Sequence, residues 1–308
     1  MSNLSISIIV PIYNIEKYLD YCLKSVILAD KRVVEILCID DGSKDRSRDI
    51  VEKYKSVDTR IKYIYKINGG ISSARNRGIK EAKGKYILFI DGDDYIIPEI
   101  FNELLNKLDR LDNFDSTWCG YFRDDWNGIH NVNTNLLLGN VKKDYIMNTF
   151  IPSFLGISYK KLYAWLRKEQ SLNEKQEFST VWRGLYKTKI IKENNIKFNE
   201  NVKTGEDVLF NLEFYYYANS IYISNDNYYC YRLRQGSLTQ NSKEFFLESK
   251  MLFIEQRDKT VDYLISKGMK DISNEYQGSL ILTKIQMALT LSKCSFKEFY
   301  VLYKKYKI

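Results

Sequence analysis

The chain has 308 residues, of which 44% are hydrophobic and 28% charged, so it can bury a full core and carry more than one structural unit. No apolar run approaches the roughly 20 residues that span a bilayer, and the first residues lack the basic segment of a secretion signal. We therefore expect a cytoplasmic protein, or one at the inner face of the membrane.

The net charge of +8 is spread through most of the chain, which is typical of a lysine-rich surface, so we expect no nucleic-acid partner. The tail, residues 290–308, differs from the rest because five lysines and one glutamate alternate there with aromatic and apolar side chains. Such a tail either docks on an anionic membrane surface or packs on the protein as a terminal helix.

Cysteine and histidine usage restricts the chemistry. The five cysteines never form a Cys-x-x-Cys pair, so neither a disulfide framework nor a zinc cluster is indicated. The single histidine, His130, lies in a polar stretch that is typical of a loop, and it cannot supply Ser-His-Asp hydrolysis or a His-rich zinc site. Any bound cation is therefore expected to have oxygen ligands, which favours Mg²⁺ or Mn²⁺.

The first hundred residues alternate between strand and helix patterns. Short apolar runs predict strands at 6–10, 33–39, 61–65 and 86–90. Apolar residues spaced by three and four predict helices over 15–26, from a cap at Ser43 to 54, and over 71–82. Such alternation implies right-handed crossovers and a parallel sheet.

Polar residues follow each predicted strand, at the edge where ligands bind in parallel sheets. The residues at the four strand ends are Pro11, Tyr13 and Asn14; Asp40, Asp41, Gly42 and Ser43; Asn68, Gly69 and Gly70; and Asp91, Gly92, Asp93 and Asp94. Together they offer an aromatic face for a base, carboxylates for imide and ribose hydrogens, and a cation site for a diphosphate. These are the groups that bind a nucleotide.

The fourth strand end carries the strongest single signal. The carboxylates of Asp91, Asp93 and Asp94 are so close that they repel one another unless a cation lies between them. Asp-Gly is, however, also a common sequence in turns. The chain has no P-loop, and no Gly-x-Gly-x-x-Gly follows the first strand. A nucleotide held by carboxylates and a metal ion remains as the interpretation.

These strings, with Ser73-Ala-Arg-Asn76 and Gly78, resemble those of family 2 glycosyltransferases with a GT-A fold. The resemblance covers about residues 5–110 and resumes around 181–210. It implies an α/β fold in which a mostly parallel nucleotide-binding sheet is flanked by helices. Its parts would be a nucleotide-sugar-binding half at 1–110, an acceptor-binding half with a helical insertion at 111–230, and a helical C-terminal extension at 231–308.

The resemblance also implies an activity. Such enzymes move a hexosyl or N-acetylhexosaminyl group from a nucleotide sugar, most often a UDP-sugar, to a hydroxyl of the acceptor with inversion at the anomeric carbon. The acceptor would be a glycan or a lipid-linked or protein-linked chain of a bacterial surface. A divalent ion, Mn²⁺ or Mg²⁺, would stabilise the departing diphosphate.

By the same resemblance, individual residues take roles at the donor. Tyr13 stacks on uracil, Asp41 accepts its imide N–H, and Asp91 touches ribose. Asp93 ligates the metal ion. Arg75 reaches a carbonyl oxygen or a phosphate, unless it is a helix-surface cation paired with an acid. Further residues expected at the donor are Pro11, Asn14, Asp40, Asn68, Gly70 and Gly92, with Arg232 and Ser237 from a loop that closes over the diphosphate.

The general base is expected in the string Gly205-Glu206-Asp207, which precedes an apolar helical pattern. A carboxylate at this place could simply stabilise the helix N-terminus. The resemblance assigns the base to Asp207, whose ordinary pKa near 3.9 would leave it ionised at pH 7.

The acceptor side is expected to include Asp94, Trp182, Arg183 and Glu206. Trp182 is either a sugar-stacking platform or a core residue, and Gly184 stands where lysine is frequent in the family. Residues 144–173 are predicted to be mostly helical and to shape the acceptor pocket.

Two other classes of function stay open. One is a non-catalytic nucleotide-sugar-binding partner of another transferase, against which Asp93 and Asp207 argue because both are present. The other is a membrane-surface scaffold of a glycan assembly complex that acts through the tail.

Overall fold

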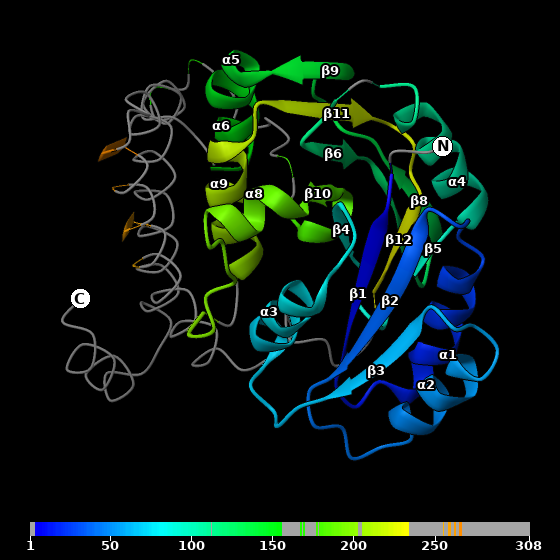
Figure 1. The fold of residues 1–308 in the computed structure, drawn as a ribbon. Coiled ribbons are helices and arrows are strands. Elements are labelled where there is room, and N and C mark those ends of the chain that lie inside the picture. The colour runs from blue at the N-terminus through cyan, green and yellow to red at the C-terminus, as the bar shows by residue number, and fades with distance from the viewer. Residues whose placement is uncertain are drawn as a thin grey trace.

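The computed structural model describes residues 4–111, 113–155, 179–202 and 205–233, with isolated positions at 167, 169, 177, 255, 258, 259, 262, 265 and 266. Its centre is an eight-stranded sheet with the order β3-β2-β1-β4-β10-β6-β11-β9 (Figure 1). This is the α/β architecture that the sequence predicts.

The first half of the sheet is parallel, because β1 pairs with both β2 and β4 and β2 pairs with β3. Its elements are β1 (Ile6–Ile12), α1 (Glu16–Ile27), β2 (Val33–Asp40), α2 (Ser47–Lys55), β3 (Ile61–Tyr65), α3 (Ile71–Glu81) and β4 (Tyr86–Phe89). The predicted alternation is confirmed, but the predicted cap at Ser43 is wrong. Helix α2 begins at Ser47 because the Ser43 hydroxyl accepts a hydrogen bond from the Asn14 N–H instead.

The second half of the sheet mixes directions. Its strands are β6 (Ser116–Cys119), β9 (Gly139–Lys142), β10 (Leu185–Lys187) and β11 (Ser220–Ser224). Strand β10 is antiparallel to both β4 and β6, so it joins the two halves into one continuous sheet. The division of the chain at residue 110 stays a prediction.

A second, four-stranded sheet has the order β5-β12-β7-β8. Its strands are β5 (Tyr95–Ile96), β7 (Tyr121–Asp125), β8 (Gly128–Val132) and β12 (Tyr229–Arg232). The predicted loop around His130 is wrong, because a short turn at Trp126 and Asn127 lets β8 pair with β7. Strand β5 follows the acidic string directly, so its pairing with β12 fixes that string against the second half of the chain.

The remaining elements are helical: α4 (Pro98–Leu108), α5 (Lys143–Tyr145), the π-helix η1 (Ile146–Phe150), α6 (Ile151–Leu155), the 3₁₀ turn η2 (Val181–Arg183), α8 (Thr188–Glu193) and α9 (Glu206–Tyr217). The sequence predicts that residues 144–173 are mostly helical. The part up to residue 155 is helical, as predicted, and most of 156–173 lies outside the described residues. Within the described parts, no helix has the length and apolarity to span a bilayer.

The two faces of the sheet bury separate cores, as strand alternation requires. Ile8 and Val10 pack toward α1 on one face, and Ile9 packs toward α3 on the other (Figure 1). Gly78 lets helix α3 approach β1 closely, since a Cβ at this position would lie only 2.4 Å from Ile9 Cγ2. This close approach sets the position of Arg75 on the same helix.

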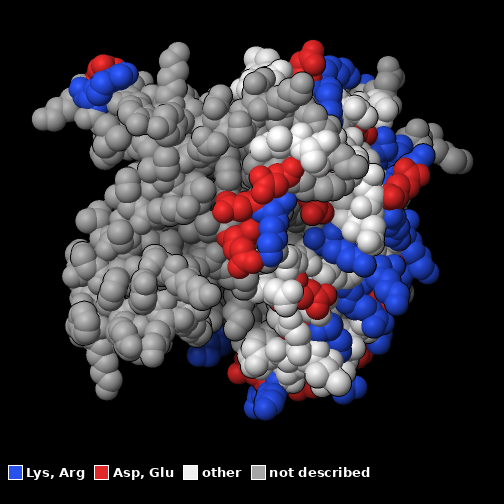
Figure 2. Space-filling view, turned by 90° about the vertical axis from the view of Figure 1, so that its left-hand side faces the viewer, with Lys and Arg blue, Asp and Glu red and all other residues white. Residues whose placement is uncertain are grey.

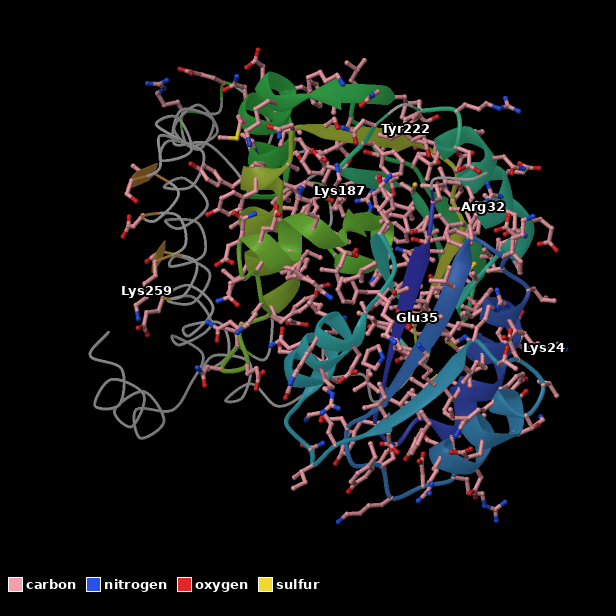
Figure 3. The ribbon with its side chains drawn as sticks, in the orientation of Figure 1. Lys24, Arg32, Glu35, Lys187, Tyr222 and Lys259 are labelled. Carbon is pink, nitrogen blue, oxygen red and sulfur yellow. The ribbon has the colours of Figure 1, made fainter. Side chains whose placement is uncertain are left out.

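A buried acid on β2 joins neighbouring parts of the first half of the sheet. Glu35 on β2, labelled in Figure 3, accepts hydrogen bonds from the Ser7 hydroxyl at 2.6 Å and the Lys83 N–H at 2.6 Å. The Lys62 ammonium pairs with its other oxygen at 2.5 Å. These contacts satisfy the carboxylate within the protein, so Glu35 has a structural role.

Candidate functional site

The carboxyl ends of the first strands meet at one edge of the sheet. The Asp41 N–H donates to the Ile12 carbonyl at 2.8 Å, and the Lys44 N–H donates to Asn14 Oδ1 at 2.8 Å. Asn14 takes a positive φ of 49°, which turns the chain after β1 toward the loop after β2. The loops that the sequence predicts to meet are therefore in contact.

The loop after β3 joins the same edge through Asp41. The Asp41 carboxylate accepts the N–H groups of Gly69 and Gly70, at 3.0 and 2.7 Å, and pairs with the Lys66 ammonium at 2.5 Å. Its side chain is only 3% exposed. Asp41 therefore orders this loop in the structure, and its contact with a uracil imide stays a prediction.

Several predicted donor residues remain accessible around this edge. Tyr13 is 51% exposed, its neighbour in sequence Asn14 is exposed, and Asn68 and Gly70 are exposed in the loop after β3. A half-exposed aromatic ring next to amide groups is a surface on which a nucleobase can stack. Their donor contacts stay predictions.

Asp40 has a structural role at its turn, and its predicted donor contact stays a prediction. Its side chain is 1% exposed, and its oxygens accept the Ser43 N–H at 2.8 Å and the Tyr63 hydroxyl at 2.6 Å. A carboxylate with both oxygens engaged in this way orders its own turn. Gly92 and Pro11 are also buried, and a Cβ at Gly92 would lie 2.2 Å from Ile15 Cδ1.

The acidic string after β4 divides into buried and accessible carboxylates. Asp94 is 1% exposed and accepts the Tyr229 hydroxyl at 2.6 Å and the Arg232 N–H at 2.8 Å. Burial, together with the charges of Asp93 and Asp91, raises its pKa well above the usual range. Asp91 and Asp93, by contrast, are partly exposed. The acceptor contact of Asp94 stays a prediction.

The donor set fits a divalent ion that is shared with a ligand. Among the residues that the structure describes, no three His, Cys, Asp or Glu side chains form a protein cage for a metal. Mg²⁺ commonly takes one or two carboxylates and completes its coordination with phosphate oxygens and water. A partly exposed Asp93 at the strand end matches that mode.

Arg75 brings the most distant parts of the site together. Its buried guanidinium pairs with Asp91 at 2.8 Å, with Asp207 at 2.7 Å and with Glu206 at 3.3 Å. Helix α3, the loop after β4 and the first turn of α9 therefore share one cation. Arg75 is thus paired with acids, the alternative that the sequence left open, and its side chain is 2% exposed. Its predicted contact with the donor stays a prediction.

Asp207 is held on both of its oxygens. Oδ1 accepts from Arg75, and Oδ2 accepts the Val181 N–H at 3.1 Å. Burial raises the pKa of Asp207 above its ordinary value, while the Arg75 charge acts in the opposite direction. The prediction of an ordinary pKa for this carboxyl is therefore wrong.

Glu206 is the neighbour of Asp207 in the same cluster. Burial, and then the Asp207 charge, raise the pKa of Glu206 to about 7. Arg75 opposes both effects. Because the cluster contains three carboxylates around one guanidinium, a proton on Glu206 reduces its excess negative charge.

Two predicted acceptor residues lie in the core. Trp182 is 2% exposed and stacks on Tyr229 with ring centroids 4.3 Å apart. Arg183 is 1% exposed and pairs with Glu177 at 2.7 Å. Burial of Trp182 agrees with the core alternative that the sequence left open for it, and the acceptor contacts of both residues stay predictions.

The neighbouring glycine has a steric explanation. A Cβ at Gly184 would lie 1.9 Å from the Thr117 carbonyl oxygen. This backbone therefore excludes a lysine at the position, and the departure from the family pattern follows from close packing of η2 on β6.

Arg232 lies beside an aromatic cluster. Its guanidinium is 4.9 Å from the Tyr95 ring centroid and 5.0 Å from that of Tyr21, and its side chain is 19% exposed. Its contact with a diphosphate stays a prediction. Ser237 and the tail 290–308 lie outside the described residues, so their predicted roles stay predictions as well.

Three residues that order the site were not predicted. Lys66 and Tyr229 hold Asp41 and Asp94, and the Val181 N–H holds Asp207. Lys66 directly follows a predicted strand, so its position could have indicated a role. Tyr229 and Val181 carry no such signal, because only the tertiary structure brings them to the carboxylates.

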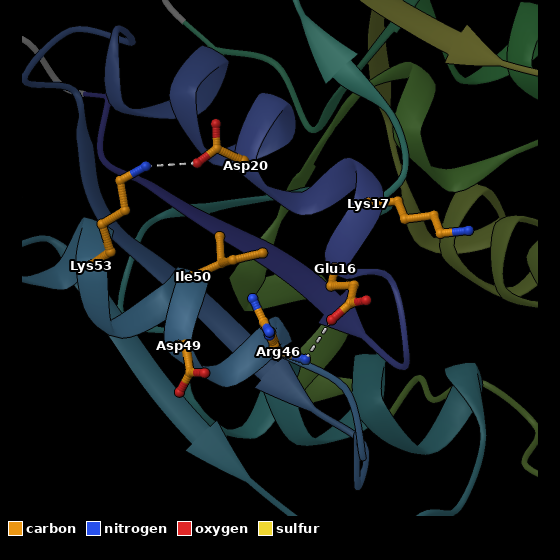
Figure 4. Close-up of a pocket in the computed structure, with 7 residues that line it drawn as sticks. All are labelled: Glu16, Lys17, Asp20, Arg46, Asp49, Ile50 and Lys53. Carbon is orange, nitrogen blue, oxygen red and sulfur yellow. Dashed lines mark hydrogen bonds and ion pairs between the residues drawn. The ribbon is translucent and has the colours of Figure 1, made fainter.

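An open cleft of about 580 Å³ lies between the helices α1 and α2 (Figure 4). Its lining includes Glu16, Asp20, Arg46 and Lys53, and the Arg46 N–H donates to Glu16 at 2.8 Å. None of the predicted donor or acceptor residues lines it. Figure 2 shows another face, on which acidic side chains gather around a basic one and further Lys and Arg lie toward the right.

Comparisons with known proteins agree with this geometry. The family model described as glycosyl transferase family 2 matches residues 7–166. The uncharacterized glycosyltransferase EpsJ of Bacillus subtilis is 32% identical, with 76% of this chain and 63% of EpsJ covered. The glycosyltransferase GlyA of Streptococcus pneumoniae is 31% identical, with 76% of this chain and 31% of GlyA covered. The chain thus spans less than two thirds of either relative.

Solved structures show the same fold. A crystal structure of S. aureus TarS 1-349 matches with a TM-score of 0.68 at 25% identity, covering 96% of this chain and 77% of that one. A crystal structure of TarS 1-349 in complex with UDP-GlcNAc matches with a TM-score of 0.62 at 28% identity, covering 82% and 66%. The sheet and its acidic carboxyl edge thus define a glycosyltransferase of the GT-A class. The chain belongs to glycosyl transferase family 2.

Proposed function

We propose that this chain transfers a sugar from a UDP-sugar to a hydroxyl of a surface glycan, with inversion at the anomeric carbon. The observation that carries the proposal is the cluster around Arg75. It joins Asp207, the candidate base, to Asp91 at the strand end where a donor would lie. A base and a donor loop held by one cation form a site for direct transfer between two bound substrates.

The names of relatives support the choice of substrates. TarS of Staphylococcus aureus is a poly(ribitol-phosphate) β-N-acetylglucosaminyltransferase, and a Bacillus spizizenii relative is a poly(ribitol-phosphate) β-glucosyltransferase. By analogy with these relatives, we propose that the transferred group is hexosyl or N-acetylhexosaminyl and that the acceptor is a hydroxyl of a polyol or glycan. Because the sugar of UDP-GlcNAc is α-linked to phosphate, formation of a β-linked product would require inversion.

In this mechanism Asp207 takes the proton of the acceptor hydroxyl. The acceptor oxygen bonds to the anomeric carbon while the bond from that carbon to the phosphate oxygen breaks, and UDP leaves with the electron pair. The Asp207 proton passes to solvent after transfer. General-base assistance of this kind typically contributes about 10²–10⁴-fold in rate.

Asp93 is the proposed ligand of a divalent ion, Mn²⁺ or Mg²⁺. When bound, such an ion would neutralise charge that develops on the departing diphosphate. Tyr13 would stack on the uracil ring, and Asp91 would meet the ribose.

The test is release of UDP from UDP-GlcNAc and UDP-glucose, measured with Mn²⁺ and with a chelator, in the presence and absence of poly(ribitol phosphate). We expect metal-dependent UDP release that an acceptor accelerates. A chain that binds UDP and releases none from either sugar would instead be a non-catalytic binding partner. A membrane scaffold would bind liposomes and respond to no nucleotide.

A further inference from the structure

We propose that Arg75 is a positioning residue of the transfer reaction, whose guanidinium fixes the Asp207 carboxylate and ties it to the loop after β4. The inference rests on the proposed function, because it assigns to Arg75 a task in the step that Asp207 would perform. It differs from the donor contact that the sequence resemblance implies for this arginine, and the experiment below distinguishes the two.

The geometry gives Arg75 two separate attachments. Nη2 donates to Asp91 Oδ1 at 2.8 Å, and Nη1 donates to Asp207 Oδ1 at 2.7 Å. Asp91 lies in the loop after β4 and Asp207 in the first turn of α9, so the guanidinium sets the distance between the donor edge and the candidate base. A planar fork can do this, whereas the single ammonium of lysine acts as one point charge.

The guanidinium is itself held rigidly. Its side chain is 2% exposed, and its Cζ lies 5.2 Å from the Phe198 ring centroid. Because Gly78 lets α3 pack closely on β1, the helix that carries Arg75 has little freedom to move away from the sheet. A cation with a fixed backbone and a fixed head can orient the groups that it contacts.

Orientation of Asp207 requires a second contact, and the structure supplies one. The Val181 N–H donates to Oδ2 at 3.1 Å, so a donor lies on each oxygen of the carboxylate. The plane of the carboxylate is thereby fixed, while each oxygen keeps a further lone pair. With its side chain 14% exposed, Asp207 can still reach a proton on a bound acceptor.

Arg75 also affects the charge of the base. Asp207 faces Arg75 from α3, Asp91 from the loop after β4 and Glu206 from its own helix. Burial raises the pKa of Asp207, and the Arg75 charge lowers it. Removal of that charge should therefore leave a smaller fraction of Asp207 ionised at neutral pH.

The experiment compares Arg75→Lys and Arg75→Gln with the wild-type chain, using UDP-GlcNAc, Mn²⁺ and poly(ribitol phosphate). We expect kcat to fall by about tenfold for lysine and by about 100-fold for glutamine, while KM for UDP-GlcNAc changes by less than about threefold. The acid limb of the kcat profile should move to higher pH in Arg75→Gln, which removes the positive charge, and should move less in Arg75→Lys, which keeps it. Arg183→Lys is the matched control, since Arg183 is an equally buried, ion-paired arginine outside the cluster.

Three results would overturn the inference. A raised KM with unchanged kcat would mean that Arg75 contacts the donor. A loss of kcat with an unmoved acid limb in Arg75→Gln, the pattern that a structural defect in Arg183→Lys would give, would mean a purely structural role. Titration of the Asp207 carboxyl by ¹³C NMR needs no turnover, and an unchanged pKa in Arg75→Gln would also contradict it. Absence of turnover in the wild-type chain would contradict the proposed function and leave this titration decisive for Arg75.

Discussion

The Tyr229 hydroxyl donates a hydrogen bond of 2.6 Å to Asp94 Oδ2, although 135 residues separate the two in sequence. Tyr229 lies on β12 of the smaller sheet, and Asp94 ends the acidic string after β4. The same tyrosine hydroxyl accepts the Asp91 N–H at 3.2 Å. One buried side chain from the second half of the chain therefore holds the acidic loop in place.

Tyr229→Phe should destabilise the protein by about 1–3 kcal/mol, because it leaves the buried Asp94 carboxyl with one donor fewer. Urea unfolding measures the change. Tyr65→Phe is the control, since Tyr65 is 60% exposed and its replacement should alter stability by less than about 0.5 kcal/mol. Equal stability of the two variants would contradict the structural role of this hydrogen bond.

Asp207→Asn should lower kcat by about 10²–10⁴-fold, since the amide cannot take the acceptor proton. Binding of UDP, measured by calorimetry, should stay within about threefold of wild type. Asp20→Asn serves as the control, because Asp20 forms an exposed pair with Lys53 far from the cluster in the fold. A parallel loss of UDP affinity and activity would instead place Asp207 at the donor.

Asp93→Asn should remove metal-dependent UDP release and leave the fold intact. We expect at least about a 100-fold loss of activity, comparable to the effect of a chelator on the wild-type chain. Thermal unfolding without metal should be unchanged, while the rise in Tm that Mn²⁺ and UDP cause together in wild type should disappear. Asp49→Asn on the exposed face of α2 is the control, and retention of the Mn²⁺ effect in Asp93→Asn would refute the assignment.

The pH dependence of stability tests Glu206, whose pKa burial raises from 4.5 to about 7 beside Asp207 and Arg75. Between these values the folded state binds a proton that the unfolded state has released. The contribution of this carboxyl is therefore complete below about pH 4.5 and is lost as the pH rises through about 7. It amounts to at most about 3 kcal/mol.

Glu206→Gln removes this titration, so the free energy of unfolding should fall less between about pH 5 and about pH 8 than it does in wild type. Urea titrations at several pH values measure the difference. Glu52→Gln on the surface of α2 should follow the wild-type curve. An unchanged slope in Glu206→Gln would mean that Glu206 titrates near its ordinary pKa.

Gly184→Ala should destabilise the chain by about 3 kcal/mol or abolish folding, because the new Cβ would meet the Thr117 carbonyl oxygen at 1.9 Å. Thermal unfolding and the yield of folded protein measure this. A stable Gly184→Ala variant would show that η2 can move away from β6, and would reopen the question of a side chain at this position.

The sequence by itself determined the strands and helices of the first half and the edge at which their loops meet. Apolar periodicity records which face of a strand or helix is buried, and the carboxyl ends of parallel strands share one edge whatever their neighbours are. The motifs at those ends were also sufficient to indicate the family, which the comparisons confirm.

Only the tertiary structure decided which polar residues face solvent. Asp40, Asp94, Trp182 and Arg183 look like binding residues in a motif but are buried, because partners from distant elements satisfy or cover them. Arg75 shows the reason most clearly, since its three carboxylates come from the loop after β4 and from α9, up to 132 residues away. Local periodicity contains no information on such contacts, whereas packing of the whole sheet fixes them.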